Sequence, residues 1–295
     1  MIKKLMSDAH FLKKMVWRRD VVKALALSAV GIGIAPAVFA QTLKIPAGSF
    51  SEHMDEHIRD YLHKMKNFDA PHDEDIKIEQ EAYPIFQSTV QRLHRLEQFA
   101  GHLNFQIIGF DEGIRIARRY ADVGKFTEAE LGFMEMIFYH DASLYGFLGE
   151  KTMTKLTDSI NKNDVIKIPD AGNYLYRGTP HQTLITIRQQ VSEGVVLTSG
   201  VRGIMKQFLL FLSKADMSRG NLSLASRSLA PPGYSFHANG DFDVGQDGLG
   251  VLNFTEKFTE TEVYTRLTDL GYLKLRYELN NPLGVRFEPW HIKIT

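Results

Sequence analysis

The sequence predicts an α+β fold in which a mainly helical region, residues 41–170, precedes a domain with a small, mostly antiparallel sheet, residues 171–295. Two observations support this division. Before residue 170, apolar side chains recur at helical spacing behind capping signals. From Ala171 onward, short alternating runs are separated by Gly and Pro at regular intervals, which is typical of strands and turns. The 295 residues, 44% of them hydrophobic, suffice for one large domain or two small ones.

The charge distribution argues against a nucleic-acid binder. The formal net charge is zero, but residues 1–40 hold seven basic and two acidic side chains, which leaves 28 basic and 33 acidic side chains in the rest. A mildly acidic protein without a basic block binds nucleic acid poorly. The chain has no cysteine, so any metal site must use His, Asp or Glu.

Residues 1–40 are typical of an export signal peptide. A basic region precedes an apolar run, and Val38–Ala40 fits a signal-peptidase site with Gln41 as the first mature residue. Within it, Arg18–Lys23 resembles the twin-arginine export motif. The apolar run is shorter than the roughly 20 residues that span a bilayer, so we expect no stable membrane span after cleavage.

Three helical segments are predicted between residues 41 and 170. Thr127 and Glu130 form a capping box before the apolar run Leu131–Leu148. Ser51–Phe68 and Asp75–Ala100 have helical spacing, and Pro84 is expected to kink or divide the second of them.

One zinc-like motif in this region is interpreted as structural. His53–His57 matches H-x-x-E-H, but enzymes with that motif need a further carboxylate ligand in a much larger catalytic domain. We therefore expect a polar helix face there.

The second region is expected to alternate helices and short strands. A helix is predicted over Gln182–Gln190, a strand over Val195–Thr198 and a helix over Arg202–Ser213. A second capping box, Thr259–Glu262, would open a helix that ends near Leu270. Four further strands are predicted at Ser235–Val244, Tyr272–Tyr277, Gly284–Phe287 and Trp290–Ile294.

A few residues of the second region can supply what a zinc hydrolase needs. Such an enzyme requires three protein ligands with one position open to water, and a base for that water's proton. His237, Asp243 and His291 can be the ligands, and Glu288 can be the base. Pro289 favours a bend, which would let Glu288 and His291 converge.

Three sequence blocks resemble the zinc D-alanyl-D-alanine carboxypeptidase and dipeptidase family, peptidase family M15, whose fold is shared with the Hedgehog signalling domain. Ser199–Gln207 is similar to the family's S-G-Y-R-S-x-x-x-Q block. Pro231–Gly240 followed by Asp243 is similar to P-P-G-Y-S-x-H-x-x-G-x-A-x-D, and Glu288–His291 matches E-x-W-H. The blocks occur in the family's order.

The resemblance implies a role for each matched residue. One zinc ion would be bound by His237, Asp243 and His291, with Glu288 as general base and Arg202 stabilising the oxyanion. Ser235 would help to hold the terminal carboxylate of the substrate, with Gln207 and Tyr234 as further contacts.

The sequence departs from the family at one important point. Only five residues separate His237 from Asp243, one fewer than usual, so Asp241 is an alternative ligand. Val201 and Gly203 also replace the family's tyrosine and serine.

The resemblance implies an exported enzyme, in the periplasm or cell envelope, that releases terminal D-alanine from peptidoglycan stem peptides. Two alternatives remain open at this point: an endopeptidase that cuts cross-links, and a non-catalytic wall-binding module with a structural metal. The sequence does not indicate an oligomeric state.

Overall fold

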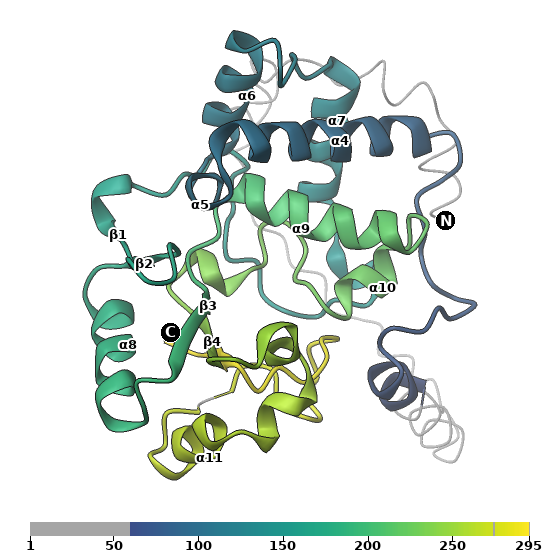
Figure 1. The fold of residues 1–295 in the computed structure, drawn as a ribbon. Helices are drawn as coiled ribbons and strands as arrows, with labels where there is room; N and C mark the ends of the chain where they lie inside the picture. Colours follow the sequence, from purple (N-terminus) through teal and green to yellow (C-terminus); the bar gives the residue numbers. More distant parts are fainter. Residues whose placement is uncertain (1–59, 274, 295) are drawn as a thin grey trace, which may run out of the picture. The chain divides into compact units, whose positions relative to one another are not determined.

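The computed structural model describes residues 60–273 and 275–294, and it shows a helical part followed by a part that contains two small sheets (Figure 1). The predicted α+β fold is confirmed. In chain order, the principal elements are α4 (Tyr83–Ala100), α5 (His102–Phe105), α6 (Phe110–Arg119), α7 (Glu128–Tyr139), β1 (Val165–Lys167), β2 (Tyr174–Tyr176), α8 (Thr179–Gln190), β3 (Val195–Ser199), α9 (Ile204–Met217), α10 (Leu222–Ser226), β4 (Phe242–Gln246), α11 (Glu262–Asp269) and β5 (His291–Ile292).

Short 3-10 helices connect these elements, and residues 60–66 are also helical. The 3-10 helices are η1 (Ala142–Tyr145), η2 (Lys162–Asp164), η3 (Phe236–Ala238), η4 (Gly250–Phe254) and η5 (Glu256–Glu260). The predicted signal peptide, its twin-arginine motif and the H-x-x-E-H segment lie outside the described residues. Within those residues, no helix combines the length and the apolar character needed to cross a bilayer.

Helix α4 begins later than predicted. The helix predicted from Asp75 starts only at Tyr83, and Pro84 lies in its first turn instead of dividing it. The first turn is where proline is tolerated, because its missing N–H would have no helical acceptor there. The predicted helix over residues 75–82 is therefore wrong.

The capping box before α7 is confirmed, although the helix is shorter than predicted. The Thr127 hydroxyl accepts a hydrogen bond from Glu130 N at 3.1 Å, and the Glu130 carboxylate accepts one from Thr127 N at 2.7 Å. The helix ends at Tyr139 instead of continuing to Leu148. The Asp141 side chain then accepts from Ser143 N and caps η1, so a local side-chain bond competes with helix continuation.

Helix α9 lies at the centre of the helical core. It packs against α4 and α6 (Figure 1). Its Phe208 and Phe211 side chains are fully buried in the first hydrophobic core, which α4, α6, α7 and α9 build together. The expected domain boundary after residue 170 stays a prediction. Residues 60–295 form one compact unit, and its first hydrophobic core contains residues from both sides of residue 170.

The sheet that carries the site has three antiparallel strands in the order β3-β4-β5. Its predicted antiparallel character is confirmed, as are α8 and β3. A second hydrophobic core packs α8 and α11 against this sheet, with Phe242, Val244 and Trp290 buried inside it. β1 and β2 form a separate antiparallel pair that the sequence analysis did not identify.

Several predicted elements near the C-terminus are wrong. Ser235–Val244 is not one strand, because η3 precedes β4, and α11 is capped by Thr261 instead of Thr259. The described residues of Tyr272–Tyr277 and of Gly284–Phe287 form no strand, and β5 contains only His291 and Ile292. These segments satisfy their backbone groups through irregular contacts: Arg286 N donates to Arg227 O at 2.8 Å.

A buried ion pair ties the segment before α4 to the end of α10. Arg227 donates to both carboxylate oxygens of Asp75, at 2.7 and 3.1 Å, and to the carbonyls of Phe68 and Ala70. The Asn221 amide donates to Asp75 as well, at 2.7 Å. Burial alone would raise the pKa of Asp75, but these donors outweigh it and lower the pKa to about 2.

This pair predicts a pH-dependent contribution to stability. Because the folded pKa of Asp75 is depressed, its contribution is complete above the unfolded value and is lost as the pH falls towards about 2. The free energy of unfolding of Asp75→Asn should be about 2 kcal/mol below that of the wild type at about pH 6, and this gap should shrink by about pH 3. Urea unfolding at both pH values measures it. Asp73→Asn, at an exposed neighbouring position, should show no gap.

Candidate metal centre

Asp243 lies on the central strand of the sheet, between the two other strands. It pairs with Ser199 of β3 after an irregularity in the register, and with His291 of β5. Pairing across β4 and β5 therefore places two of the three predicted ligands side by side, although they are 48 positions apart in the chain.

The third predicted ligand, His237, comes from the 3-10 helix that precedes β4. The chain turns from η3 into β4 at Gly240, whose φ of +114° is a backbone conformation that side-chain-bearing residues rarely adopt. This sharp turn brings His237 back onto Asp243 in spite of the shortened spacing between them.

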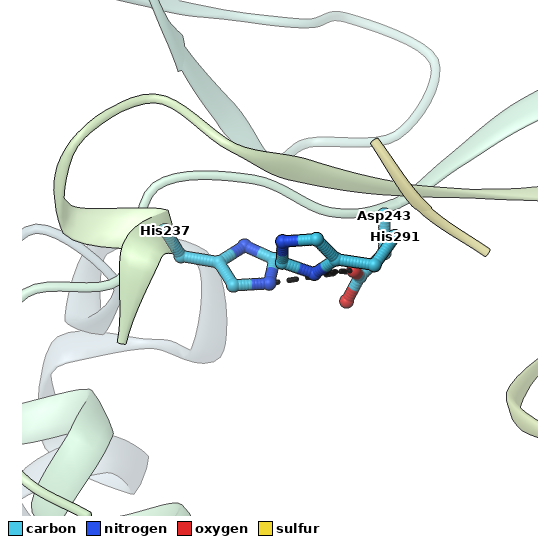
Figure 2. A group of neighbouring side chains, drawn as sticks. All are labelled: His237, Asp243 and His291. Carbon is cyan, nitrogen blue, oxygen red and sulfur yellow. Dashed lines mark hydrogen bonds and ion pairs between the residues drawn. The ribbon is translucent and has the colours of Figure 1, made fainter. Parts of the chain in front are cut away.

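The three side chains converge, and all are buried (Figure 2). His237 Nε2 lies 3.3 Å and His291 Nδ1 3.0 Å from the same Asp243 oxygen, Oδ1. One ligand atom from each residue lies within 4.8 Å of the others. Two imidazole nitrogens and one carboxylate oxygen are a ligand set that suits zinc.

The outer nitrogen of each histidine has its own acceptor. His237 Nδ1 lies 2.8 Å from Gly200 O, and His291 Nε2 lies 3.0 Å from Asp241 Oδ2. A carbonyl only accepts, so His237 donates through Nδ1 and presents the lone pair of Nε2 to the centre. Metal-binding histidines are commonly oriented in this way, with the outer N–H held by a carbonyl or a carboxylate. The residues therefore fit a bound metal ion.

The electrostatics of the centre also favour a cation. Burial, together with the Arg202 charge, lowers the pKa of His237 to about 4, so this imidazole stays neutral, as a ligand must. Burial would lower the pKa of His291 too, but the Asp241 and Asp243 carboxylates outweigh it and raise the pKa to about 9. Burial would raise the pKa of Asp243, but His237, His291 and Arg202 hold it well below its usual value.

Asp241, the alternative ligand in the sequence analysis, lies on the outer side of His291. Besides the His291 bond, its carboxylate accepts from Arg276 Nε at 2.7 Å and from Ile294 N at 2.9 Å. The group of three that could hold a metal contains Asp243 and not Asp241. This geometry favours Asp243 as the ligand and Asp241 as the residue that orients His291.

Glu288 and Arg202 flank the three ligands. Glu288 Oε2 lies 4.0 Å from His291 Nδ1, and the turn at Pro289 brings the two residues together, as predicted. Burial raises the pKa of Glu288 to about 7. Arg202 donates to Asp243 Oδ2 at 2.8 Å through Nη2 and to Ser199 Oγ at 2.9 Å through Nε.

A cavity of about 410 Å³ opens beside the centre, and Arg202, Asp243 and Glu288 line it. Trp290 lines it too, but its side chain is 3% exposed and packs in the sheet core and against Phe254. Trp290 therefore packs beside the candidate metal site.

The three predicted substrate contacts do not line this cavity. Gln207 is buried and joins the first two sequence blocks: its amide donates to Arg202 O at 2.9 Å and accepts from Gly233 N at 2.8 Å. Ser235 is buried, and Tyr234 packs edge-on against Phe147. Their roles towards a substrate stay predictions.

Two arginines that lie outside the predicted site residues, Arg276 and Arg286, are close to the centre. Arg276 contacts Asp241, and Arg286 lines the cavity. Neither lies within a block used for the resemblance, and single arginines carry no pattern of their own. Only the tertiary contacts identify them.

The structure thus combines a buried His, Asp, His group that could hold a metal ion with a carboxylate, Glu288, beside it. Residues 179–294 match the family model of VanY, D-alanyl-D-alanine carboxypeptidase. This match confirms the resemblance predicted from the three sequence blocks, and it supports a metallopeptidase of the D-alanyl-D-alanine carboxypeptidase type. No curated protein matches the chain.

Three solved structures are similar to part of the chain. The LdcB LD-carboxypeptidase shares 18% identity and covers 45% of this chain and 69% of its own, with a TM-score of 0.39. A mutant of the vancomycin-resistance D,D-pentapeptidase VanY in complex with Zn(II) shares 21%, covering 51% of this chain and 86% of its own, with a TM-score of 0.36. VanYB in complex with D-alanine-D-alanine shares 21%, covering 50% and 83%, with a TM-score of 0.37.

Removing a ligand should abolish tight zinc binding. His237→Ala leaves two ligands, so we expect a loss of at least about 100-fold in zinc affinity. Competition with a zinc-binding dye measures the affinity directly. His181→Ala, on helix α8 and outside the group, is the control that should bind like the wild type. Full zinc occupancy in His237→Ala would refute the ligand assignment.

Removing the outer carboxylate should weaken zinc binding without abolishing it. Asp241→Asn keeps the shape of the side chain but removes the charge that holds His291, so we expect about 10- to 100-fold weaker binding. Asp247→Asn, an exposed position at the end of the same strand, should have no effect. An Asp241→Asn affinity as low as that of His237→Ala would instead make Asp241 a ligand.

Proposed function

We propose that this protein is a zinc-dependent D-alanyl-D-alanine carboxypeptidase that acts on peptidoglycan stem peptides. The observation that carries the proposal is the convergence of His237, Asp243 and His291 beside Glu288, at the edge of a cavity. The match of residues 179–294 to the family model supports the reaction type.

His237 Nε2, His291 Nδ1 and an Asp243 oxygen would hold one zinc ion. When bound, zinc would supply Lewis acidity, lowering the pKa of a water molecule and polarising the peptide carbonyl.

Glu288 serves as the general base in this proposal. Its pKa, raised to about 7 by burial, lets it take a proton from the attacking water and return that proton to the leaving amine. It lines the cavity together with Asp243, so the same carboxylate contacts the space where a substrate would lie.

Arg202 has two roles in this proposal. Its Nη2 holds Asp243 in position, and its permanent charge beside the cavity stabilises the negative oxygen that forms during attack. Ser199 supports this placement by accepting a hydrogen bond from the Arg202 Nε.

Ser235 would help to hold the terminal carboxylate of the substrate, as the family resemblance implies. An enzyme that acts on peptidoglycan meets its substrate outside the cytoplasm, so we infer export to the periplasm or cell envelope. The signal-peptide pattern of residues 1–40 supports this inference.

A purely structural metal is disfavoured by the geometry. A structural zinc site usually closes its fourth position with a protein ligand. Among residues 60–273 and 275–294, the group contains three candidate ligands, and the cavity reaches Asp243.

Replacing the base should remove activity but not the metal. Glu288→Gln should lower kcat for release of D-alanine by about 100- to 10,000-fold, the usual contribution of a general base, at unchanged zinc occupancy. Zinc-loaded protein is incubated with muropeptides ending in D-Ala-D-Ala, and mass spectrometry quantifies free D-alanine. Glu278→Gln, at an exposed position, is the matched control. Equal activity of Glu288→Gln and wild type would disprove the catalytic role. Conversion of cross-linked muropeptides to monomers without release of D-alanine would indicate an endopeptidase.

A further inference from the structure

The cavity contains a cation that the proposed mechanism does not use. Arg286 lies two residues before Glu288 and lines the same cavity. Among residues 60–273 and 275–294, no carboxylate lies within ion-pair distance of it. The cavity's other basic side chains each have one, as the pairs Arg202–Asp243, Lys206–Glu97, His102–Glu97 and Lys214–Asp69 show.

Two aromatic rings hold the Arg286 guanidinium. Its central carbon lies 4.9 Å from the ring centroid of Phe68 and 4.9 Å from that of Trp290. Trp290 is itself fixed in the sheet core, so the cation is positioned before any ligand arrives. A charge already in place loses little conformational freedom when it binds an anion.

The guanidinium also has an unused donor. Arg286 Nε is buried and has no hydrogen-bond partner in the described part of the chain. A buried donor without an acceptor costs free energy, so binding an oxygen there is favoured. Carboxylates suit this position because their two oxygens match the paired N–H groups of arginine.

Two neutral polar groups in the same cavity lack partners as well. They are Gln106 Oε1 and Thr198 Oγ1, both buried atoms. The Gln106 amide is fixed on its other side by a 2.6 Å hydrogen bond to Asn173. An amide oxygen, a hydroxyl and a fixed cation along one cavity fit an extended peptide that carries a carboxylate.

We propose that Arg286 determines specificity by binding a carboxylate that the substrate peptide carries on the amino-terminal side of the scissile bond. The inference rests on the proposed function. In the proposed function Ser235 holds the terminal carboxylate, and Ser235 does not line the cavity. The part of the peptide before the scissile bond would then occupy the cavity and pass Glu288 and Arg286. Glu288 and Arg286 are two positions apart, which in an extended chain is roughly 6 to 7 Å, the length of about two peptide residues. The acidic group of the substrate therefore lies within about two residues of the scissile bond.

Matched peptides test the proposal. Zinc-loaded protein is given acetyl-X-D-Ala-D-Ala in which X is glutamate or glutamine, and kcat/KM is measured for each. The wild type should prefer the glutamate peptide by about 10- to 100-fold. Arg286→Gln should lose this preference and cleave both peptides at about the wild-type rate for the glutamine peptide. Arg286→Lys, which keeps the charge without the paired donors, should retain part of the preference.

Lys214→Gln is the matched control, because Lys214 is a cation of the same cavity that already pairs with Asp69. It should keep the full preference. Cleavage of both peptides at equal rates by the wild type, or a preference that survives in Arg286→Gln, would overturn the proposal. A third outcome would also overturn it. If Arg286→Gln kept the glutamate preference but no longer distinguished a free C-terminus from an amidated one, Arg286 would bind the terminal carboxylate instead.

A binding measurement separates this inference from the proposed function. Calorimetry with the zinc-loaded Glu288→Gln variant compares the affinities of the two peptides without requiring cleavage. The Glu288→Gln variant should bind the glutamate peptide more tightly, and adding Arg286→Gln to it should remove this preference. That result would support the inference even if the wild type cleaved neither peptide. The lack of cleavage would then count against the proposed function alone.

Discussion

The carboxylate of Asp243 is the interaction on which the rest of the site depends. It lies on the central strand, accepts from Arg202 with one oxygen and faces both histidines with the other. A buried carboxylate without partners would be expensive, and here the surrounding positive groups stabilise its charge. Loss of Asp243 would therefore remove a candidate ligand and leave Arg202, His237 and His291 without their common partner.

The histidines are held by the fold more than by each other. His237 is anchored by the carbonyl of Gly200, just after β3, and His291 by Asp241, just before β4. Gly200 itself has no room for a side chain, because an added Cβ would lie 2.0 Å from Tyr174 O. The backbone of the first sequence block thus positions a residue of the second.

The sequence predicted the α+β fold, the antiparallel sheet and the group of candidate ligands, because each has a local or motif-level signal. Capping at Thr127 and the buried strand from Val195 depend on neighbouring residues only. The end of the chain was predicted poorly, since Tyr272–Tyr277 alternates like a strand but finds no partner strand in the described residues. Arg276 and Arg286 acquire their meaning only from contacts between distant segments, so no pattern in the sequence could have identified them. The spacing of the second block indicated Asp241 as an alternative ligand, but only the structure shows that it holds the outer nitrogen of His291.

The wall of the cavity combines residues from both regions of the chain. Asp69, His102 and Gln106 precede residue 170, whereas Asp243 and Glu288 follow it. The candidate bond-breaking groups are thus confined to one region, while the other contributes to the surface that a peptide would contact. Substitutions in the earlier region can then alter which peptides are accepted while the metal ligands stay intact, so selectivity and reactivity can evolve at different rates within one polypeptide.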